Sequence, residues 1–218
     1  MGEFITITAQ DSFSFSAFEA KPENAPRGGI IILQEIFGVN AHIQDVCNRY
    51  AAKGYHTIAP ALFDRSEKNI ALAYDQDGIA QGRAHKEQVD AFAETDIFAC
   101  LNTLSDDQPK AVIGYCWGGS LAWRMACRHD GLDVAIAYYG GELPSLKDET
   151  PRCRVQTHFG EKDPTIPMEG VHAFIAAQPD VDHHIYDAGH GFNCDRRNQY
   201  DDAAAALAQS RVDAFLNF

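Results

Sequence analysis

The sequence predicts an α/β fold with a mostly parallel, doubly wound sheet, an antiparallel N-terminal edge and helices on both faces. Two observations predict it. Short apolar segments alternate with longer segments of helical period along most of the chain, which is typical of parallel strands joined by right-handed crossover helices. The first 19 residues instead hold two segments in which apolar and polar residues alternate, as in antiparallel strands with one face in water.

The N-terminal strands follow from these local patterns. Phe4–Thr8 and Phe13–Glu19 alternate on either side of the turn residues Gln10–Ser12, so they are expected to pair antiparallel at the sheet edge. Ile30–Leu33 is apolar without alternation, which indicates a strand buried on both faces. Parallel architecture is therefore expected to begin at this strand.

A helix and a strand are expected next, followed by a long polar segment. His42–Lys53 has a helical period and ends at Gly54, and the strand Tyr55–Ala59 follows. Residues 63–83 are polar and aperiodic apart from a short possible helix, which is typical of a binding loop. His85–Leu104 carries a long helical period. The segment 63–83 is therefore a candidate for substrate contact.

The C-terminal half repeats the alternation of strand and helix. Strands are expected at Ala111–Tyr115, Val134–Tyr139, Arg154–Gly160 and His183–Tyr186. Helices are expected at Trp117–Arg128, at His172–Ala177 as the end of a longer helix, and at Tyr200–Leu216.

Size and charge exclude several classes of protein. A chain of 218 residues with 45% hydrophobic content can bury one substantial core, so residues 1–218 are interpreted as a single domain. The net charge of −13 and the pI near 5.0 argue against nucleic acid or an anionic membrane as partner. The chain has no basic and apolar leader and no membrane-length apolar run, so a cytoplasmic protein is expected. Six scattered cysteines without C-x-x-C spacing fit reduced thiols.

The segment Lys110–Ser120, KAVIGYCWGGS, carries the main chemical signal. Its buried strand turns at glycines into a helix, and Gly114-x-Cys116-x-Gly118 is the nucleophile-elbow pattern with sulfur in place of the serine oxygen. Small residues are needed at the flanks because the tight turn brings neighbouring backbone close. The N-terminus of the following helix favours the thiolate form of Cys116.

Two further residues stand in the chain order that an α/β-hydrolase requires after its nucleophile. Asp163 lies in a turn after the predicted strand at 154–160, and His190 lies between two glycines after the predicted strand at 183–186. In this arrangement His190 exchanges protons with Cys116 and with water, while Asp163 orients the imidazole. Cys116, Asp163 and His190 are therefore predicted to form a hydrolytic triad.

A fourth group follows the first parallel strand. Glu35 is predicted to point its carboxylate towards the sulfur and to accept the thiol proton when substrate binds. The loop after this strand usually supplies one oxyanion-hole N–H, so the backbone amides of Ile36 and Trp117 are the expected donors.

Four segments, QEIFGVN, GYCWGG, GEKDPTIP and AGHGF, together resemble the dienelactone hydrolase (carboxymethylenebutenolidase) family over nearly the whole chain. The resemblance implies an α/β-hydrolase fold, a triad of Cys116, Asp163 and His190, and Glu35 as the activating carboxylate. It also implies hydrolysis of a lactone ester whose carboxylate is held by arginines.

The arginine pattern departs from that family. The arginine that members carry four residues after the histidine is Cys194 here. Arg196 or Arg197 is a candidate to substitute for it, and Arg83 is a candidate for the second anion contact. A related small ester, lactone or thioester is therefore as plausible a substrate as dienelactone.

The sequence predicts a cysteine-dependent hydrolase of small activated esters or lactones that works through an acyl-thioester. A small-molecule thioesterase or a general carboxylesterase is the alternative. The expected partner is the small-molecule substrate, with no cofactor and no metal, in a monomer or small homo-oligomer. The sequence leaves two other interpretations of the protein open. In one the protein binds a metal ion through a cluster of side chains, and in the other Cys116 is a redox-sensing thiol. The cluster would comprise His183, His184, His190 and Cys194.

Overall fold

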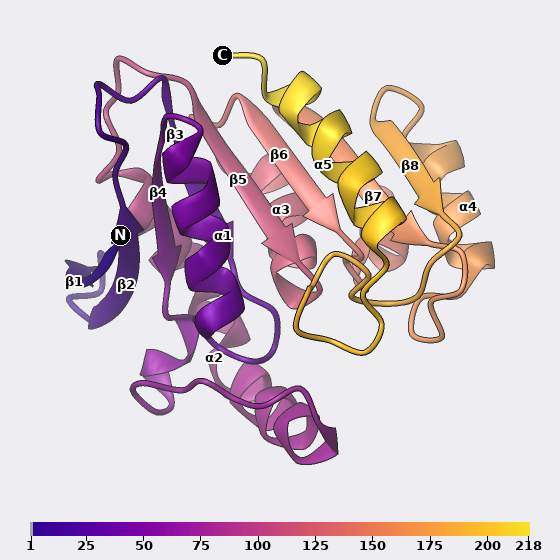
Figure 1. Ribbon diagram of the computed structural model, residues 1–218, viewed down its shortest axis with the longest axis horizontal. Helices are drawn as coiled ribbons and strands as arrows, with labels where there is room; N and C mark the ends of the chain where they lie inside the picture. The colour runs from indigo at the N-terminus through magenta and orange to yellow at the C-terminus, as the bar shows by residue number, and fades with distance from the viewer. Residues whose placement is uncertain (1) are drawn as a thin grey trace. The chain divides into compact units, whose positions relative to one another are not determined.

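The computed structural model describes residues 2–218, which form two structural units (Figure 1). Of these residues, the first unit comprises 2–111 with Phe218, and the second comprises 112–217. Across residues 2–218 there are eight strands, mostly parallel, with an antiparallel N-terminal pair. The predicted fold class is confirmed, and the single domain stays a prediction.

The first unit contains four strands in the order β1-β2-β4-β3. The strand bounds are β1 Glu3–Thr8, β2 Ser14–Ala20, β3 Gly28–Leu33 and β4 Tyr55–Pro60. β1 pairs antiparallel with β2, and β2 pairs antiparallel with β4, whereas β3 and β4 are parallel. Every residue of β3 is buried, as the unalternating apolar run predicts.

Helix α1 (Ala41–Ala52) packs on β4, and its start is set by Asn40. The Asn40 Oδ1 atom accepts hydrogen bonds from the backbone N–H groups of His42 and Ile43 at 3.1 and 3.3 Å. This side chain satisfies two of the donors that a helix start leaves open. The cap therefore fixes where the loop after β3 ends.

The long segment after β4 differs from the prediction. A short 3₁₀ helix, η1 (Leu62–Arg65), is followed by α2 (Gln76–Leu101), which begins at Gln76 rather than at His85. Asp75 caps α2 by accepting a hydrogen bond from the N–H of Gly78 at 2.7 Å. The first turns of α2 are largely exposed, so they carry no apolar period from which a helix could be predicted.

The second unit contains strands in the order β5-β6-β7-β8. Their bounds are β5 Lys110–Tyr115, which crosses the unit boundary, β6 Val134–Tyr138, β7 Arg154–Gly160 and β8 Asp182–Tyr186. β6, β7 and β8 run parallel.

The helices of the second unit cover both faces of its strands. They are α3 Trp117–Arg128, the 3₁₀ helix η2 Leu143–Leu146, α4 Met168–Ala177 and α5 Asp202–Leu216. α3 packs on β6 and α5 packs on β7, from opposite sides in Figure 1. Within residues 2–218, no helix has both the length and the apolar composition needed to cross a membrane.

Candidate active site

Cys116 occupies a strained turn between β5 and α3. Its backbone has φ 57° and ψ −114°, a region that non-glycine residues rarely adopt and that costs about 1–3 kcal/mol. The turn is held by a hydrogen bond from the N–H of Cys116 to the carbonyl of Tyr138 at 3.0 Å. A Cβ atom on Gly114 would overlap the backbone of Gly118, and one on Gly119 would overlap the carbonyl of Tyr138. These close contacts explain the small residues of the elbow.

The surroundings of Cys116 differ from those of the other cysteines. Cys116 is half-buried at the N-terminus of α3. Burial raises the pKa of the Cys47 and Cys127 thiols to about 12 and that of Cys153 to about 11, and it holds the pKa of Cys100 well above its usual range. Those four side chains therefore stay protonated at neutral pH, as expected for structural cysteines.

Asp163 and His190 meet beyond the ends of β7 and β8. The Nδ1–H of His190 donates to Oδ2 of Asp163 at 2.6 Å. The Asp163 side chain is 1% exposed and that of His190 is 13% exposed, so the pair is shielded from water. The other carboxylate oxygen of Asp163 accepts hydrogen bonds from Thr165, from its N–H at 2.7 Å and from its hydroxyl at 2.6 Å.

The imidazole of His190 also forms a hydrogen bond with the sulfur of Cys116. Because Nδ1 faces Asp163, the Nε2 side of the ring is the one that remains for the sulfur. Burial by itself would lower the pKa of His190. The negative charge of the Cys116 thiolate and the hydrogen bonds to Asp163 and Cys116 outweigh it and raise that pKa to about 10.

The carboxylate of Asp163 has a complementary shift. Its burial would raise the pKa, but the hydrogen bond from His190 and the positive charge of the imidazolium hold the pKa below its usual range. At neutral pH Asp163 and His190 therefore form a pair of carboxylate and imidazolium, and the sulfur of Cys116 lies beside the imidazole. The structure brings together all three residues that the sequence predicted as a triad.

Two neighbours of His190 were not predicted. The ring centroid of Tyr139 lies 5.0 Å from that of the imidazole. The backbone of Tyr139 has φ 37°, and its N–H donates to the carbonyl of His158 at 2.7 Å. The Thr165 hydroxyl lies 3.0 Å from Nδ1 of His190. In the sequence, only the Tyr139-Gly-Gly turn after a strand and the position of Thr165 two residues beyond Asp163 could have indicated them.

Glu35 and Ile36 belong to the first unit. Glu35 follows β3 and is 1% exposed. The segment before and at the start of α2 packs against the loop that holds Glu35. Gly82 of α2 lies so close to the carbonyl of Ile36 that a Cβ atom there would overlap it, and the N–H of Leu72 donates to the carbonyl of Phe37 at 2.9 Å. The segment that the sequence suggested as a binding loop thus supports this one. The roles of Glu35, Ile36 and Trp117 stay predictions.

The three candidate arginines lie in different settings. Arg83 is exposed and lies on α2 rather than in a loop. Arg196 is exposed, whereas Arg197 is half-buried in the segment between β8 and α5. A Cβ atom on Gly191 would lie 2.6 Å from Nη1 of Arg197, so this guanidinium rests against the residue that follows His190. Arg197 is therefore the arginine that the second unit places beside the candidate site.

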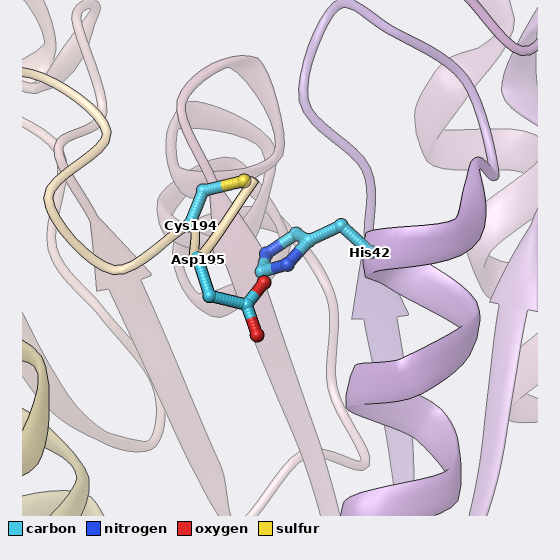
Figure 2. A group of neighbouring side chains, drawn as sticks. All are labelled: His42, Cys194 and Asp195. Atoms are coloured by element: carbon cyan, nitrogen blue, oxygen red, sulfur yellow. The ribbon is translucent and has the colours of Figure 1, made fainter. Parts of the chain in front are cut away.

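Cys194, which stands in the position of the family arginine, is buried in the same segment. Its N–H donates to the carbonyl of Gly191 at 3.0 Å, and its carbonyl accepts from the N–H of Arg197 at 3.1 Å. Figure 2 shows its side chain next to Asp195 in this segment, and it also shows His42 in the first turn of α1. The backbone turn at Cys194 is what carries Arg197 back towards Gly191.

The alternative metal cluster is not assembled. His183 bonds Thr157 Oγ1 through Nδ1 and the carbonyl of Gln178 through Nε2, both at 2.8 Å. His184 instead lies 3.2 Å from Asp182 Oδ2. Neighbouring residues of a strand point to opposite faces of the sheet, so these two imidazoles lie on opposite sides of β8.

Comparison with known proteins identifies the family. The model of the dienelactone hydrolase family matches residues 15–218. The chain belongs to this family. A relative from Yersinia pestis, named "Putative carboxymethylenebutenolidase", is 33% identical, with 89% of this chain and 80% of the relative covered. One of the same name from Azospirillum brasilense is 31% identical, with 97% and 96% covered.

A solved structure agrees with this membership. The crystal structure of a "Putative Dienelactone Hydrolase" from Klebsiella pneumoniae subsp. pneumoniae superimposes with a TM-score of 0.85 at 26% identity, covering 100% of this chain and 99% of that one. The dienelactone hydrolase homologue described here is therefore an α/β-hydrolase and a carboxylic-ester hydrolase of the carboxymethylenebutenolidase-like type.

Proposed function

We propose that this protein hydrolyses small activated esters or lactones with Cys116 as nucleophile, through an acyl-thioester intermediate. The observation that carries the proposal is the position of His190, which bonds Asp163 on one side and Cys116 on the other. This geometry matches the roles of nucleophile, general base and orienting acid. The depressed pKa of Asp163 and the raised pKa of His190 support an ion pair between these two residues before substrate binds.

The first half of the reaction forms the thioester. The Cys116 thiolate attacks the carbonyl carbon of the substrate, and the carbonyl π electrons move to the oxygen to give a tetrahedral oxyanion. Collapse of the intermediate breaks the bond to the leaving-group oxygen, which takes the proton from Nε2 of His190. In a lactone the leaving group stays attached to the acyl chain. A thiolate is itself readily expelled, which favours activated esters with good leaving groups.

The second half releases the acid. His190, now neutral, removes a proton from a water molecule whose oxygen attacks the thioester carbonyl. The new intermediate expels the thiolate of Cys116, and the pair of thiolate and imidazolium is restored. No cofactor takes part in any of these steps. Asp163 keeps Nδ1–H in place throughout, so that Nε2 is the nitrogen that exchanges the proton.

The oxyanion and the activation step involve the first unit in this proposal. The backbone amides of Ile36 and Trp117 stabilise the oxyanion, and Glu35 accepts the thiol proton of Cys116 when substrate binds. The positions of these residues support the proposal. Ile36 lies in the loop after β3, and in this fold the loop at that place supplies an oxyanion-hole N–H. Trp117 directly follows Cys116, and Glu35 is a buried carboxylate.

The substrate is proposed to carry a carboxylate. The guanidinium of Arg197 rests against Gly191, one residue beyond His190, where it can form a bidentate contact with an anion. Arg83 and Arg196 are exposed and are the weaker candidates. A neutral ester or a thioester is the alternative substrate class. The cytoplasmic location and a monomer or small homo-oligomer remain predictions from the sequence.

Turnover of a p-nitrophenyl ester and of a carboxylate-bearing lactone tests the proposal. We expect hydrolysis that needs no added metal, one equivalent of iodoacetamide for full inactivation, and loss of about 10³-fold or more in kcat in Cys116→Ala and in His190→Ala. Cys153→Ala is the matched control, because that thiol is also half-buried but precedes the start of β7, whereas Asp163 follows the end of that strand. Turnover that survives Cys116→Ala would disprove cysteine catalysis.

Glu35→Gln isolates the activation step. We expect a slower burst of acylation with unchanged deacylation, because an amide cannot accept the thiol proton. An unchanged acylation rate would remove Glu35 from the mechanism. If no ester is turned over and Cys116 is reversibly oxidised by low peroxide, the redox-sensor interpretation replaces the hydrolase mechanism at this residue.

A further inference from the structure

The hydroxyl of Thr165 lies between the two residues that orient each other in the site. Its Oγ1 atom is 2.6 Å from Oδ1 of Asp163 and 3.0 Å from Nδ1 of His190. The N–H of the same residue donates to the same oxygen of Asp163 at 2.7 Å. Thr165 thus makes three polar contacts with the pair, although its turn lies at the surface.

The single hydroxyl proton can serve only one of these partners. Asp163 is ionised and offers acceptors alone, so the Thr165 hydroxyl donates to Oδ1. A lone pair of Oγ1 then faces the Nδ1–H of His190. That proton is shared between Oδ2 of Asp163, at 2.6 Å, and Oγ1 of Thr165, at 3.0 Å.

Fixing the turn does not require the hydroxyl. The backbone N–H of Thr165 already closes an Asx-type turn with the Asp163 carboxylate, and Pro164 and Pro167 restrict the backbone on both sides. The hydroxyl adds a second donor on Oδ1, which holds the carboxylate plane so that Oδ2 faces the imidazole. It also adds the second acceptor for Nδ1–H, which no backbone group of this turn provides.

We propose that Thr165 is a positioning residue for the hydrolytic site, because its hydroxyl fixes the Asp163 carboxylate and accepts part of the hydrogen bond from His190 Nδ1–H. The inference rests on the proposed function. It adds to the site a further polar side chain, one that acts through Asp163 and His190 and touches no substrate. A serine in this place can make the same contacts, whereas a valine has the same shape without the oxygen.

The test compares Thr165→Val, Thr165→Ser and Thr150→Val. Thr150 is an exposed threonine in the loop before β7 and is the matched control. The measurements are kcat and KM for p-nitrophenyl acetate, and the ¹H NMR signal of the His190 Nδ1 proton. A melting temperature for each variant shows whether the turn remains folded.

In Thr165→Val we expect kcat to fall about 10-fold to 100-fold with KM within about 2-fold, as for loss of a hydrogen bond to a charged pair. The Nδ1 proton signal should broaden or shift, since one acceptor is gone. Thr165→Ser should restore both readouts, and Thr150→Val should leave both unchanged.

Three results overturn the inference, and they distinguish its failure from that of the proposed function. If turnover depends on Cys116 but Thr165→Val keeps the wild-type kcat and the wild-type Nδ1 signal, only the role of Thr165 is wrong. The same conclusion follows if Thr165→Ser behaves like Thr165→Val, because the hydroxyl is then not the active group. If wild-type turnover persists in Cys116→Ala, the proposed function and the role of Thr165 are both wrong.

Discussion

Removal of the thiolate should change the titration of His190 more than any other single substitution in the site. The pKa of this imidazole is raised from 6.5 to about 10, and the charge of Cys116 is the largest contribution in the upward direction. The rise corresponds to about 5 kcal/mol at about 1.4 kcal/mol per pH unit. Cys116→Ala is therefore the perturbation that measures how strongly sulfur and imidazole interact.

The expected size follows from the charges. A unit charge about 4 Å away contributes about 4 kcal/mol at an effective dielectric of about 20, or about 3 pH units. In Cys116→Ala, burial continues to lower the pKa of His190 and the hydrogen bond to Asp163 continues to raise it. We expect the pKa to fall by at least about 2 pH units, towards the ordinary value of histidine.

A histidine-selective NMR titration between about pH 5 and 11 measures this change. His183 is an internal control, because burial lowers its pKa and it bonds Thr157 and Gln178 rather than Cys116. A His190 pKa that stays near 10 in Cys116→Ala would refute the idea that the thiolate raises it. A wild-type pKa near 6.5 would refute the ion pair itself.

The sign of the linked stability can be worked out for the variant. With the thiol absent, any pKa of His190 that remains above 6.5 in the folded protein means that the folded state binds the proton more tightly than the unfolded state. The corresponding stabilisation is complete below pH 6.5 and is lost as the pH rises through the folded pKa. Urea unfolding of Cys116→Ala across this range should therefore show a falling free energy of unfolding.

Three further predictions concern the elbow, the anion contact and the first unit. Gly114→Ala should lower the free energy of unfolding by about 1–3 kcal/mol or more in urea titrations, because the new Cβ atom would overlap the backbone at the start of α3. A Cβ atom on Gly141 would meet no atom within 4 Å, so Gly141→Ala should leave the free energy of unfolding unchanged. Arg197→Ala should raise KM about 10-fold for a carboxylate-bearing ester but not for a neutral one. Arg65→Ala should cost about 3–5 kcal/mol in urea unfolding, because it leaves the 1% exposed Asp96 without its bidentate partner at 2.7 and 2.8 Å.

Each of these outcomes has a matched comparison. A Gly114→Ala protein as stable as Gly141→Ala would contradict the steric account of the elbow. Arg196→Ala should leave the selectivity unchanged, and an equal effect there would argue for a diffuse positive field in place of a contact. Arg152→Ala breaks an exposed pair with Asp130 and should cost less than about 1 kcal/mol, so an equal cost for Arg65→Ala would contradict the burial argument.

Much of the fold was predictable because its signals are local. The fully buried β3 follows from four consecutive apolar residues, and α3 begins and ends at the predicted Trp117 and Arg128. The start of α2 was not predictable from apolar period, because its first turns face solvent and the Asp75 cap is a single polar residue in a polar segment. Apolar patterns therefore fail to predict a helix start that is stabilised by a capping side chain and makes few contacts with the core.

The sequence by itself determined which residues are proposed to carry the chemistry. The glycines around Cys116, and the order of Asp163 and His190 after buried strands, form a motif that can be read from the residues alone. Only the tertiary structure decided that the Thr165 hydroxyl lies within reach of both members of the pair and that Arg197 lies against Gly191. The pKa of about 10 for His190 likewise depends on a charge 74 positions away along the chain (190 − 116), because electrostatic and hydrogen-bond energies depend on distance in space and not on separation in sequence.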